Sequence, residues 1–227
     1  MALELDDVAV SARIAAACES MRLPCSPAQR AQLCRYIREM QKWNRTYNLT
    51  ALRDPAQMLV QHIFDSLAPI VPLTRMLGGA HVQASLCDIG SGGGLPGVVF
   101  AVMNPHWKVQ CIDAVEKKTA FVRQMVGALS LDNLQATHSR VEQLEPQQAD
   151  IVVSRAFASL IDFATWSGKH VADGGLLVAM KGKIPDDEID VLHATSAWRV
   201  ESVEALVVPE LDAQRCLVWM RRNKGNP

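Results

Sequence analysis

A glycine-rich segment between two apolar runs is the part of the sequence best suited to hold a ligand. The apolar run LCDI leads into GSGGGLPG and then into the apolar stretch GVVFAVM, so the glycines lie where a strand passes into a helix. Gly90, Gly92 and Gly94 permit positive φ and leave the backbone open to a ligand. The first amides of the following helix point into the same crevice. This arrangement favours a cofactor that contains a nucleoside.

Two acidic residues flank this turn. Asp88 precedes Gly90 by two residues, where its carboxylate can hold amides of the turn and attract a positively charged group. Asp113 ends the next predicted strand, where a carboxylate accepts hydrogen bonds from both hydroxyls of an unphosphorylated ribose. NAD, FAD and S-adenosylmethionine enzymes all use glycines here, but the cationic methionine end of S-adenosylmethionine suits Asp88 best. Ordinary acids at strand ends are the simpler alternative, which the joint spacing of the pair disfavours.

The segment DIVVSRAFASL, residues 150–160, restricts the acceptor of a methyl group. It lacks both the Asn/Asp-Pro-Pro-aromatic loop that grips exocyclic amines and a cysteine nucleophile for carbon-5 methylation of pyrimidines. A ring nitrogen such as guanine N7 has a free lone pair, so transfer to it needs only alignment and a suitable electrostatic setting. Arg155 could bind guanine O6 or the cofactor, or pair with Asp88 or Asp113. An arginine that merely ties strand to loop is the alternative.

The elements that must position these residues change in character near residue 76. Before it, helical signals dominate: an apolar stripe follows Asp6-Asp7, a second helix opens at Ser26-Pro27, and a third opens at Asp54-Pro55. After it, short apolar runs alternate with amphipathic stretches, which is typical of strand–helix–strand units. We therefore expect an N-terminal helical extension over residues 1–75 and one compact α/β domain over residues 76–227.

The expected sheet is mostly parallel. Five parallel strands are predicted, over residues 85–89, 108–112, 134–137, 150–154 and 176–180. A short helix is predicted over residues 185–193. The runs 198–208 and 215–221 are then joined by PELD, which is too short for a crossover helix, so they should form an antiparallel pair. This pattern is that of the Rossmann-like class I methyltransferase fold, because a dinucleotide dehydrogenase would repeat the parallel half.

Composition leaves these expectations open. The 227 residues are 49% hydrophobic, enough for a folded enzyme, and 23 basic against 24 acidic side chains neither support nor exclude a nucleic-acid partner. The six cysteines are scattered without a Cys-x-x-Cys pair, which predicts reduced thiols, and the histidines lack the spacing of metal ligands. The acidic start MALELDD and the absence of a long apolar run predict a cytoplasmic protein without a membrane span. We expect a monomer without a metal.

Six segments together resemble one known family. The chain is similar to the RsmG, or GidB, family of bacterial small-subunit ribosomal RNA guanine-N7 methyltransferases. The segments are KWNRTYNLTALRDP (42–55), QHIFDSL (61–67), DIGSGGGLPG (88–97), SRVEQL (139–144), SRAFASL (154–160) and ALVVPELDAQRCLV (205–218). The resemblance implies S-adenosylmethionine-dependent methylation of the guanine at position 527 of 16S ribosomal RNA, on naked RNA or on a small-subunit particle.

The resemblance also implies site residues. Carried over by motif, the cofactor contacts are Gly90, Leu95, Val141, Glu142 and Arg155. The turn residues Asp88, Gly92 and Gly94 and the ribose carboxylate of Asp113 complete the predicted cofactor site, and Arg155 is also the candidate catalytic residue. This chain has SGGG where relatives often have TGPG or SGAG, a change that should leave the turn functional.

The RNA-binding face is expected to be basic. Candidate contacts are Arg45, Arg53, His62, Arg123 and Lys181, with Arg35, Arg38, Lys42 and Lys183 as further cations and Trp43 and Tyr47 as stacking groups. The alternatives are a solvated helix face for the cations, core packing for Trp43, which we favour, and a local hydrogen-bonding role for His62. His62 and Asp65, three residues apart on a helix, could face the pocket.

Other functions are compatible with parts of this pattern. A class I methyltransferase could act on another RNA, a small molecule or a protein, in which case a closed pocket is expected. A nicotinamide oxidoreductase is opposed by the terminal hairpin and Asp88. A non-catalytic RNA-binding module is opposed by the intact glycine turn with both of its acids.

Overall fold

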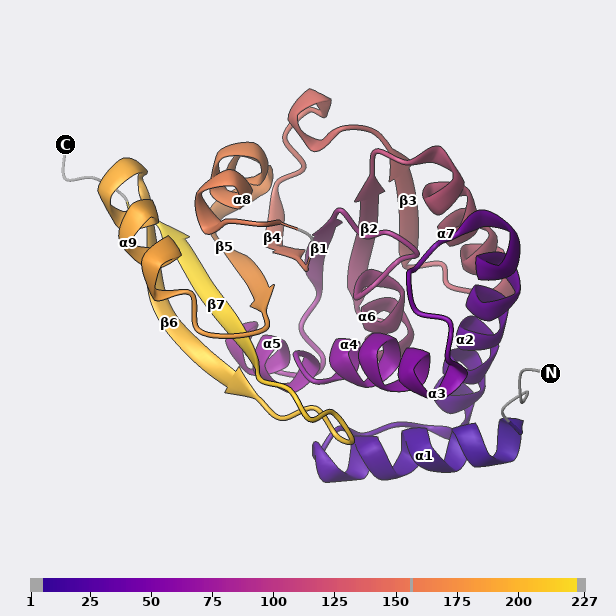
Figure 1. Cartoon of the computed structure of the whole chain (residues 1–227). Coiled ribbons are helices and arrows are strands. Elements are labelled where there is room, and N and C mark those ends of the chain that lie inside the picture. The colour runs from indigo at the N-terminus through magenta and orange to yellow at the C-terminus, as the bar shows by residue number, and fades with distance from the viewer. Residues whose placement is uncertain (1–5, 156, 224–227) are drawn as a thin grey trace.

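A seven-stranded sheet forms the centre of the protein (Figure 1). The computed structural model describes residues 6–155 and 157–223. The strand order is β3-β2-β1-β4-β5-β7-β6. Strands β1 to β5 are parallel, and β7 is antiparallel to both β5 and β6. The bounds are β1 Ala84–Ile89, β2 Trp107–Asp113, β3 Leu134–His138, β4 Ala149–Ser154, β5 Val171–Lys181, β6 Trp198–Leu206 and β7 Arg215–Arg222. The predicted parallel sheet with a terminal hairpin is confirmed.

Two strand bounds differ from the sequence expectation by more than one residue. Strand β5 begins at Val171 rather than near residue 176, because its first half contains Asp173, Gly174 and Gly175 and has no apolar pattern. Its pairing with β4 is irregular there, between Ala149 and Ile151. Strand β6 ends at Leu206, two residues before the predicted end.

Helices cover both faces of the sheet, each over its own hydrophobic cluster. Helices α6 (Gly97–Met103) and α7 (Glu116–Leu129) pack on β2 and β3, whereas α8 (Leu160–Ser167) and α9 (Asp186–Thr195) pack on β5 and β6. A short 3₁₀ turn, η2 (Val141–Gln143), precedes β4, and another, η3 (Gly168–His170), directly follows α8. Along β7, Leu217 and Trp219 enter one cluster and Val218 and Met220 the other, as the two-residue period of a strand requires.

The N-terminal helices begin where the sequence predicts. Asp6 caps α1 (Asp7–Ser20), Ser26 forms a capping box with Gln29 at the start of α2 (Pro27–Tyr47), and Asp54 caps α3 (Pro55–Met58). The chain continues as a π-helical segment, η1 (Leu59–Phe64), into α4 (Asp65–Leu67), and then into α5 (Ile70–Met76). The π-helical segment was not predicted, and such segments are frequent at functional sites.

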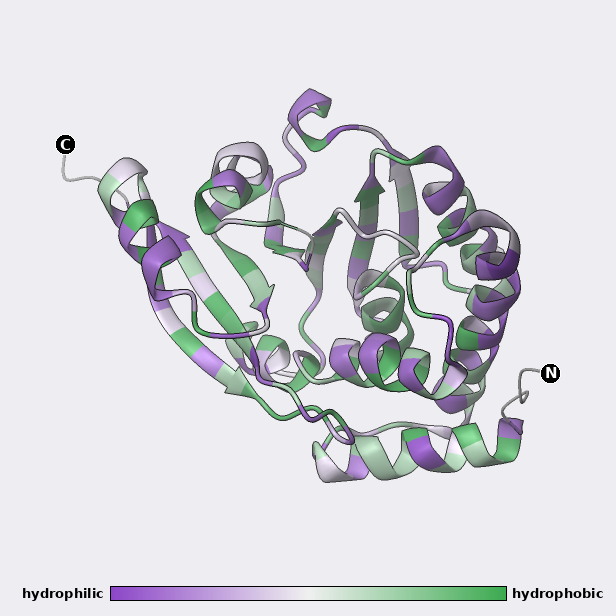
Figure 2. Cartoon of the chain, in the orientation of Figure 1, coloured by the Kyte–Doolittle hydropathy of each residue, from purple (hydrophilic) through white to green (hydrophobic). Residues whose placement is uncertain are grey.

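The N-terminal helices share their core with the sheet. Ile14 of α1 and Leu33 and Tyr36 of α2 belong to the same buried cluster as Ile151 and Trp219 of the sheet. Figure 2 shows apolar and polar residues alternating along α1, as expected for a helix with one face against a core. The division into an extension (1–75) and a domain (76–227) stays a prediction. None of the helices in the described part of the chain is long and apolar enough to cross a membrane.

Candidate functional site

A cleft of about 560 Å³ lies at the carboxyl ends of the central strands. It lies where ligands bind in open α/β sheets. The N-terminal helices supply one wall, the glycine turn the floor, and the ends of β4, β5 and β7 the other wall. Its lining includes Met40, Leu49, Thr50, Leu52, Gln61, His62, Asp65, Gly90, Ser91, Gly92, Gly93, Leu95, Arg155, Met180, Lys181, Gly182 and Arg215.

A second hollow of about 240 Å³ lies on the other side of Gly90, which lines both. Its walls are Ile89, Gly90, Ile112, Asp113, Ala114, Ser139, Arg140, Val141, Glu142, Phe157 and Trp166. Trp166 is 43% exposed, which is unusual for so large an apolar side chain. A ligand that crosses the turn at Gly90 can therefore place a flat apolar group in the small hollow and a polar group in the cleft.

The glycine turn has the backbone conformation that the sequence predicts. Gly90, Gly92 and Gly94 have φ values of 69°, 59° and 91°. A Cβ atom on Gly94 would lie 2.4 Å from Cγ2 of Val98, so a larger residue is excluded there by space as well as by conformation. Leu95 is buried beside the cleft.

Asp88 holds the start of the helix that follows the turn. Its Oδ2 accepts a hydrogen bond from the amide of Gly97 at 2.8 Å, while its Oδ1 is buried without a partner in the described part of the chain. Burial raises the pKa of Asp88 to about 7, against the opposing effects of the Gly97 amide and of Arg155. The carboxyl group is therefore close to half ionised at neutral pH, and a nearby cation would favour its charged form.

Asp113 holds the other part of the turn. Its Oδ2 accepts from the amide of Gly92 at 2.8 Å and its Oδ1 accepts from the amide of Val115 at 2.8 Å. Asp113 lines the small hollow and is not among the residues that line the cleft. Val141 and Glu142 line the same hollow, so the structure brings together the acid of β2 and the segment after β3. The ribose contact of Asp113 stays a prediction.

Arg155 reaches across the cleft to the N-terminal helices. Its Nη1 donates to Oδ2 of Asp65 at 2.9 Å and to the carbonyl of Gln61 at 3.2 Å. The sequence left open an ion pair of Arg155 with Asp88 or Asp113. In the structure Arg155 pairs with Asp65 instead. Asp65 begins α4, directly after the π-helical segment that carries His62, and both residues line the cleft.

Arg215 was missed by the sequence reasoning. Its Nε donates to Oδ1 of Asp65 at 2.8 Å, so one carboxylate holds two guanidinium groups. The only sequence signal was its place in the segment ALVVPELDAQRCLV, which carried the family resemblance without assigning Arg215 a role.

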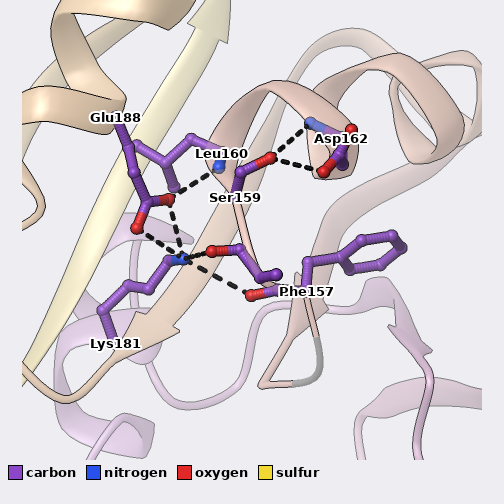
Figure 3. A network of polar contacts seen from close by, with 7 residues as sticks. Phe157, Ser159, Leu160, Asp162, Lys181 and Glu188 are labelled. Carbon is purple, nitrogen blue, oxygen red and sulfur yellow. Dashed lines mark hydrogen bonds and ion pairs between the residues drawn. The ribbon is translucent and has the colours of Figure 1, made fainter.

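Lys181 is held in a polar network that fixes the loop after β4 (Figure 3). Its Nζ donates to Oε2 of Glu188 at 2.8 Å and to the carbonyls of Ala158 and Phe157 at 3.2 and 3.4 Å. Oε2 of Glu188 also accepts from the amide of Leu160 at 2.8 Å. The network therefore links the end of β5 and the start of α9 to the loop that carries Phe157, a wall of the small hollow.

The other predicted RNA contacts are scattered. His62 lines the cleft, lies 3.0 Å from the hydroxyl of Thr50, and has a pKa lowered to about 4 by burial and by Arg155, so it is neutral at neutral pH. Arg53 donates to the side-chain oxygen of Asn48 and to the carbonyl of Asn44, so it caps the end of α2. Arg45 is exposed in a groove between α1 and α2, and exposed Arg123 lies near the carbonyl of Ala136. Only His62 and Lys181 of the five line the cleft.

The remaining candidate residues have structural neighbours. Trp43 packs against Phe121 and Tyr47 with ring centroids 5.4 and 4.8 Å apart, which confirms the favoured packing role. The six cysteines are unpaired. Within residues 6–155 and 157–223 there is no cluster of three or more His, Cys, Asp or Glu side chains that could hold a metal ion.

Comparison with known proteins agrees with this geometry. The sequence model of the family GidB, rRNA small subunit methyltransferase G, matches residues 29–218. The chain is 64% identical to a ribosomal RNA small subunit methyltransferase G of Bordetella pertussis, with 94% of each chain covered. It is 47% identical to a protein of the same name in Paracidovorax citrulli, over 96% of this chain and 92% of that one.

Solved structures agree on the fold. A SAM-dependent methyltransferase of Aquifex aeolicus superposes with a TM-score of 0.55 at 16% identity, over 76% of this chain and 96% of the other. At that identity the likeness concerns the fold alone, which is the class I methyltransferase fold expected from the strand pattern. Together with the matched residues of the cleft, these similarities show that the chain belongs to the GidB family of rRNA small subunit methyltransferases G.

Proposed function

We propose that the protein transfers the methyl group of S-adenosylmethionine to N7 of a guanine in 16S ribosomal RNA, at position 527. The observation that carries the proposal is the family match over residues 29–218, which includes the glycine turn, both of its acids and the two arginines of the cleft. The substrate is the RNA itself or a small-subunit particle. We further propose that the protein acts in the cytoplasm as a monomer.

The two hollows fit the shape and charge of S-adenosylmethionine. The small hollow offers Val141 and Trp166 to an adenine and the Asp113 carboxylate to a ribose. The open backbone at Gly90 lets the chain of the cofactor pass into the cleft, where Arg155 can bind its carboxylate. The buried Oδ1 of Asp88 has no partner among the described residues, and a cationic ligand nearby would favour the charged form of this carboxyl group.

The chemistry of the transfer needs little from the protein beyond alignment. The cofactor supplies a methyl group on a positively charged sulfur. Transfer to guanine N7 forms a carbon–nitrogen bond, breaks the carbon–sulfur bond and removes no proton from the base, so no general base is required. His62 is neutral and paired with Thr50, which suits a site that orients its substrate rather than exchanging protons. Arg155 stands where it can orient the cofactor or guanine O6.

The test is transfer of labelled methyl from S-adenosylmethionine to small-subunit ribosomal RNA from cells that lack their own enzyme, followed by mapping of the modified base. We expect label at N7 of one guanine, and none on RNA from cells that have the enzyme, because that site is already methylated. Binding of the cofactor without labelling of RNA or of small-subunit particles would refute the RNA acceptor. It would favour the alternative, a class I methyltransferase for another acceptor.

A further inference from the structure

Two arginines from different strands share one carboxylate at the wall of the cleft. Arg155 follows β4 and Arg215 begins β7, and they donate to the two oxygens of Asp65 at 2.9 and 2.8 Å. The Asp65 side chain is only 7% exposed, whereas each arginine side chain is 24% exposed. A buried carboxylate thus fixes two guanidinium groups that still reach the cleft.

The cleft is positively charged at this place. Asp65 is the single acid among the described residues that line it, against Arg155, Arg215 and Lys181. Lys181 is already paired with Glu188. His62 is neutral at neutral pH. One carboxylate against two guanidinium groups leaves a net charge of about +1, which favours binding of an anion.

The two arginines come from strands at different positions relative to β1, the strand that leads into the cofactor turn. Arg155 follows β4, which pairs with β1, the strand that leads into the turn. Arg215 begins β7, which is two strands further along the sheet than β4. In Arg215 the Nε is bonded to Asp65 and Nη1 to the carbonyl of Gln214, while Nη2 has no bond to any described residue. Arg215 therefore keeps one donor nitrogen that no described residue occupies, at the wall of the cleft.

We propose that Arg215 binds a backbone phosphate of the RNA beside the target guanine, and that Asp65 is a positioning residue that holds Arg215 in the required direction. This inference rests on the proposed RNA substrate. A guanidinium group that is already fixed loses little conformational freedom when it binds a phosphate, and its planar donors match the phosphate oxygens. The same subsite chemistry would suit the carboxylate of the cofactor, so the test has to separate the two anions.

The experiment compares Arg215→Gln with the unchanged protein in binding to a small-subunit ribosomal RNA transcript, over about 50 to 200 mM salt. We expect RNA affinity to fall about threefold to tenfold, and the slope of log affinity against log salt to decrease by about one, as for the loss of one phosphate contact. Calorimetry should show S-adenosylmethionine affinity within about twofold of the unchanged protein. Arg75→Gln is the matched control, since Arg75 pairs with Glu204 outside the cleft and its loss changes the net charge equally.

Asp65→Asn tests the positioning role. It makes the cleft more positive, so a purely electrostatic view predicts tighter RNA binding, whereas loss of positioning predicts weaker binding. We expect weaker binding. An unchanged salt slope in Arg215→Gln, or a loss of cofactor affinity in its place, would overturn the inference. The proposed function is tested separately, because methylation by the unchanged protein does not depend on the outcome with either variant.

Discussion

At the scale of single residues, the site depends on two acids that accept hydrogen bonds from backbone amides. Asp113 holds the amide of Gly92 and Asp88 holds the amide of Gly97, so the two ends of the turn are fixed by side chains of adjacent strands. The sequence placed both acids correctly relative to the glycines. Because both acids bond the backbone of the turn, each stabilises the turn in addition to any contact that it makes with a ligand.

Replacement of Asp113 should weaken cofactor binding. In Asp113→Ala the turn loses the acceptor for Gly92 and the proposed ribose contact, and we expect S-adenosylmethionine affinity to fall by about 1–3 kcal/mol. Isothermal calorimetry measures this. Asp150→Ala is the control, because Asp150 also accepts two hydrogen bonds, both from Ser85, but lies at the opposite ends of the strands. Equal affinity in Asp113→Ala and the unchanged protein would contradict the assigned role.

Asp88 should make stability depend on pH. Its pKa is about 7 in the folded protein and near 3.8 in the unfolded chain, so unfolding between these values releases a proton. The stability contributed by the neutral carboxyl group is complete below pH 3.8 and is lost as pH rises toward 7. Relative to Asp88→Asn, the free energy of unfolding should fall by about 1 kcal/mol per pH unit between roughly pH 5 and 6.5, then level off.

Denaturant titrations without cofactor measure this dependence at each pH. The asparagine keeps an oxygen acceptor for Gly97 but does not titrate, so the difference between the two proteins isolates Asp88. A constant difference over this pH range would show that the carboxyl group stays ionised in the fold.

At the scale of elements, two segments bring distant residues to the cleft. The π-helical segment η1 carries His62 and leads into Asp65, and the network of Lys181 and Glu188 fixes the loop between β4 and α8. Phe157, whose carbonyl this network holds, lines the small hollow and lies two residues after Arg155 in the sequence. Both segments therefore contribute to the site by positioning its residues. No local sequence pattern predicts these positions.

Loss of the Lys181 network should loosen the loop. In Lys181→Met two backbone carbonyls and Glu188 lose their common donor, and we expect weaker S-adenosylmethionine binding, by about threefold to tenfold, with little loss of overall stability. Calorimetry and thermal unfolding measure the two effects. Lys183→Met removes the same charge from an exposed position two residues away and should leave both unchanged. Equal effects of the two substitutions would indicate that charge alone, rather than the network, is responsible.

At the scale of the whole molecule, the N-terminal helices are part of the fold that holds the cofactor turn. The phenol of Tyr36 on α2 is fully buried and donates to the carbonyl of Gly93 at 2.6 Å. Ile14 of α1 lies in the same cluster as residues of the sheet. A substitution that disturbs the packing of these helices is therefore expected to alter the conformation of the cofactor turn.

This shared core predicts a single cooperative unfolding transition. Ile14→Ala should lower the free energy of unfolding by about 2–5 kcal/mol, because it leaves a cavity in a fully buried region. Val8→Ala on the same helix should have little effect, since Val8 is 75% exposed. Denaturant titrations followed by circular dichroism and by tryptophan fluorescence should coincide. Two separate transitions would mean that the helices and the sheet unfold independently.

The sequence by itself determined the features that depend on neighbouring residues. The strand–glycine–helix turn, the caps at Asp6, Ser26 and Asp54, and the short link before β7 are local, because hydrogen bonds and φ restrictions act over a few residues. The six motif segments also indicated the family and its cofactor, because they occur together and in the same order along the chain. The parallel direction of the first five strands and the antiparallel pairing of the last two followed from the lengths of the connections between them.

Only the tertiary structure decided how distant side chains pair. Asp65 and Arg215 are 150 residues apart, and Arg155 lies 90 residues from the same carboxylate. No periodicity records such a contact, because it depends on strand order and on the turn of a π-helical segment. From the sequence, Lys181 was expected to be a free cation at the end of a strand. In the structure its ammonium group is bonded to backbone carbonyls and to Glu188. The fold decides which acidic group each basic side chain meets. The contacts of the basic residues were therefore harder to predict from the sequence than the conformation of the glycines.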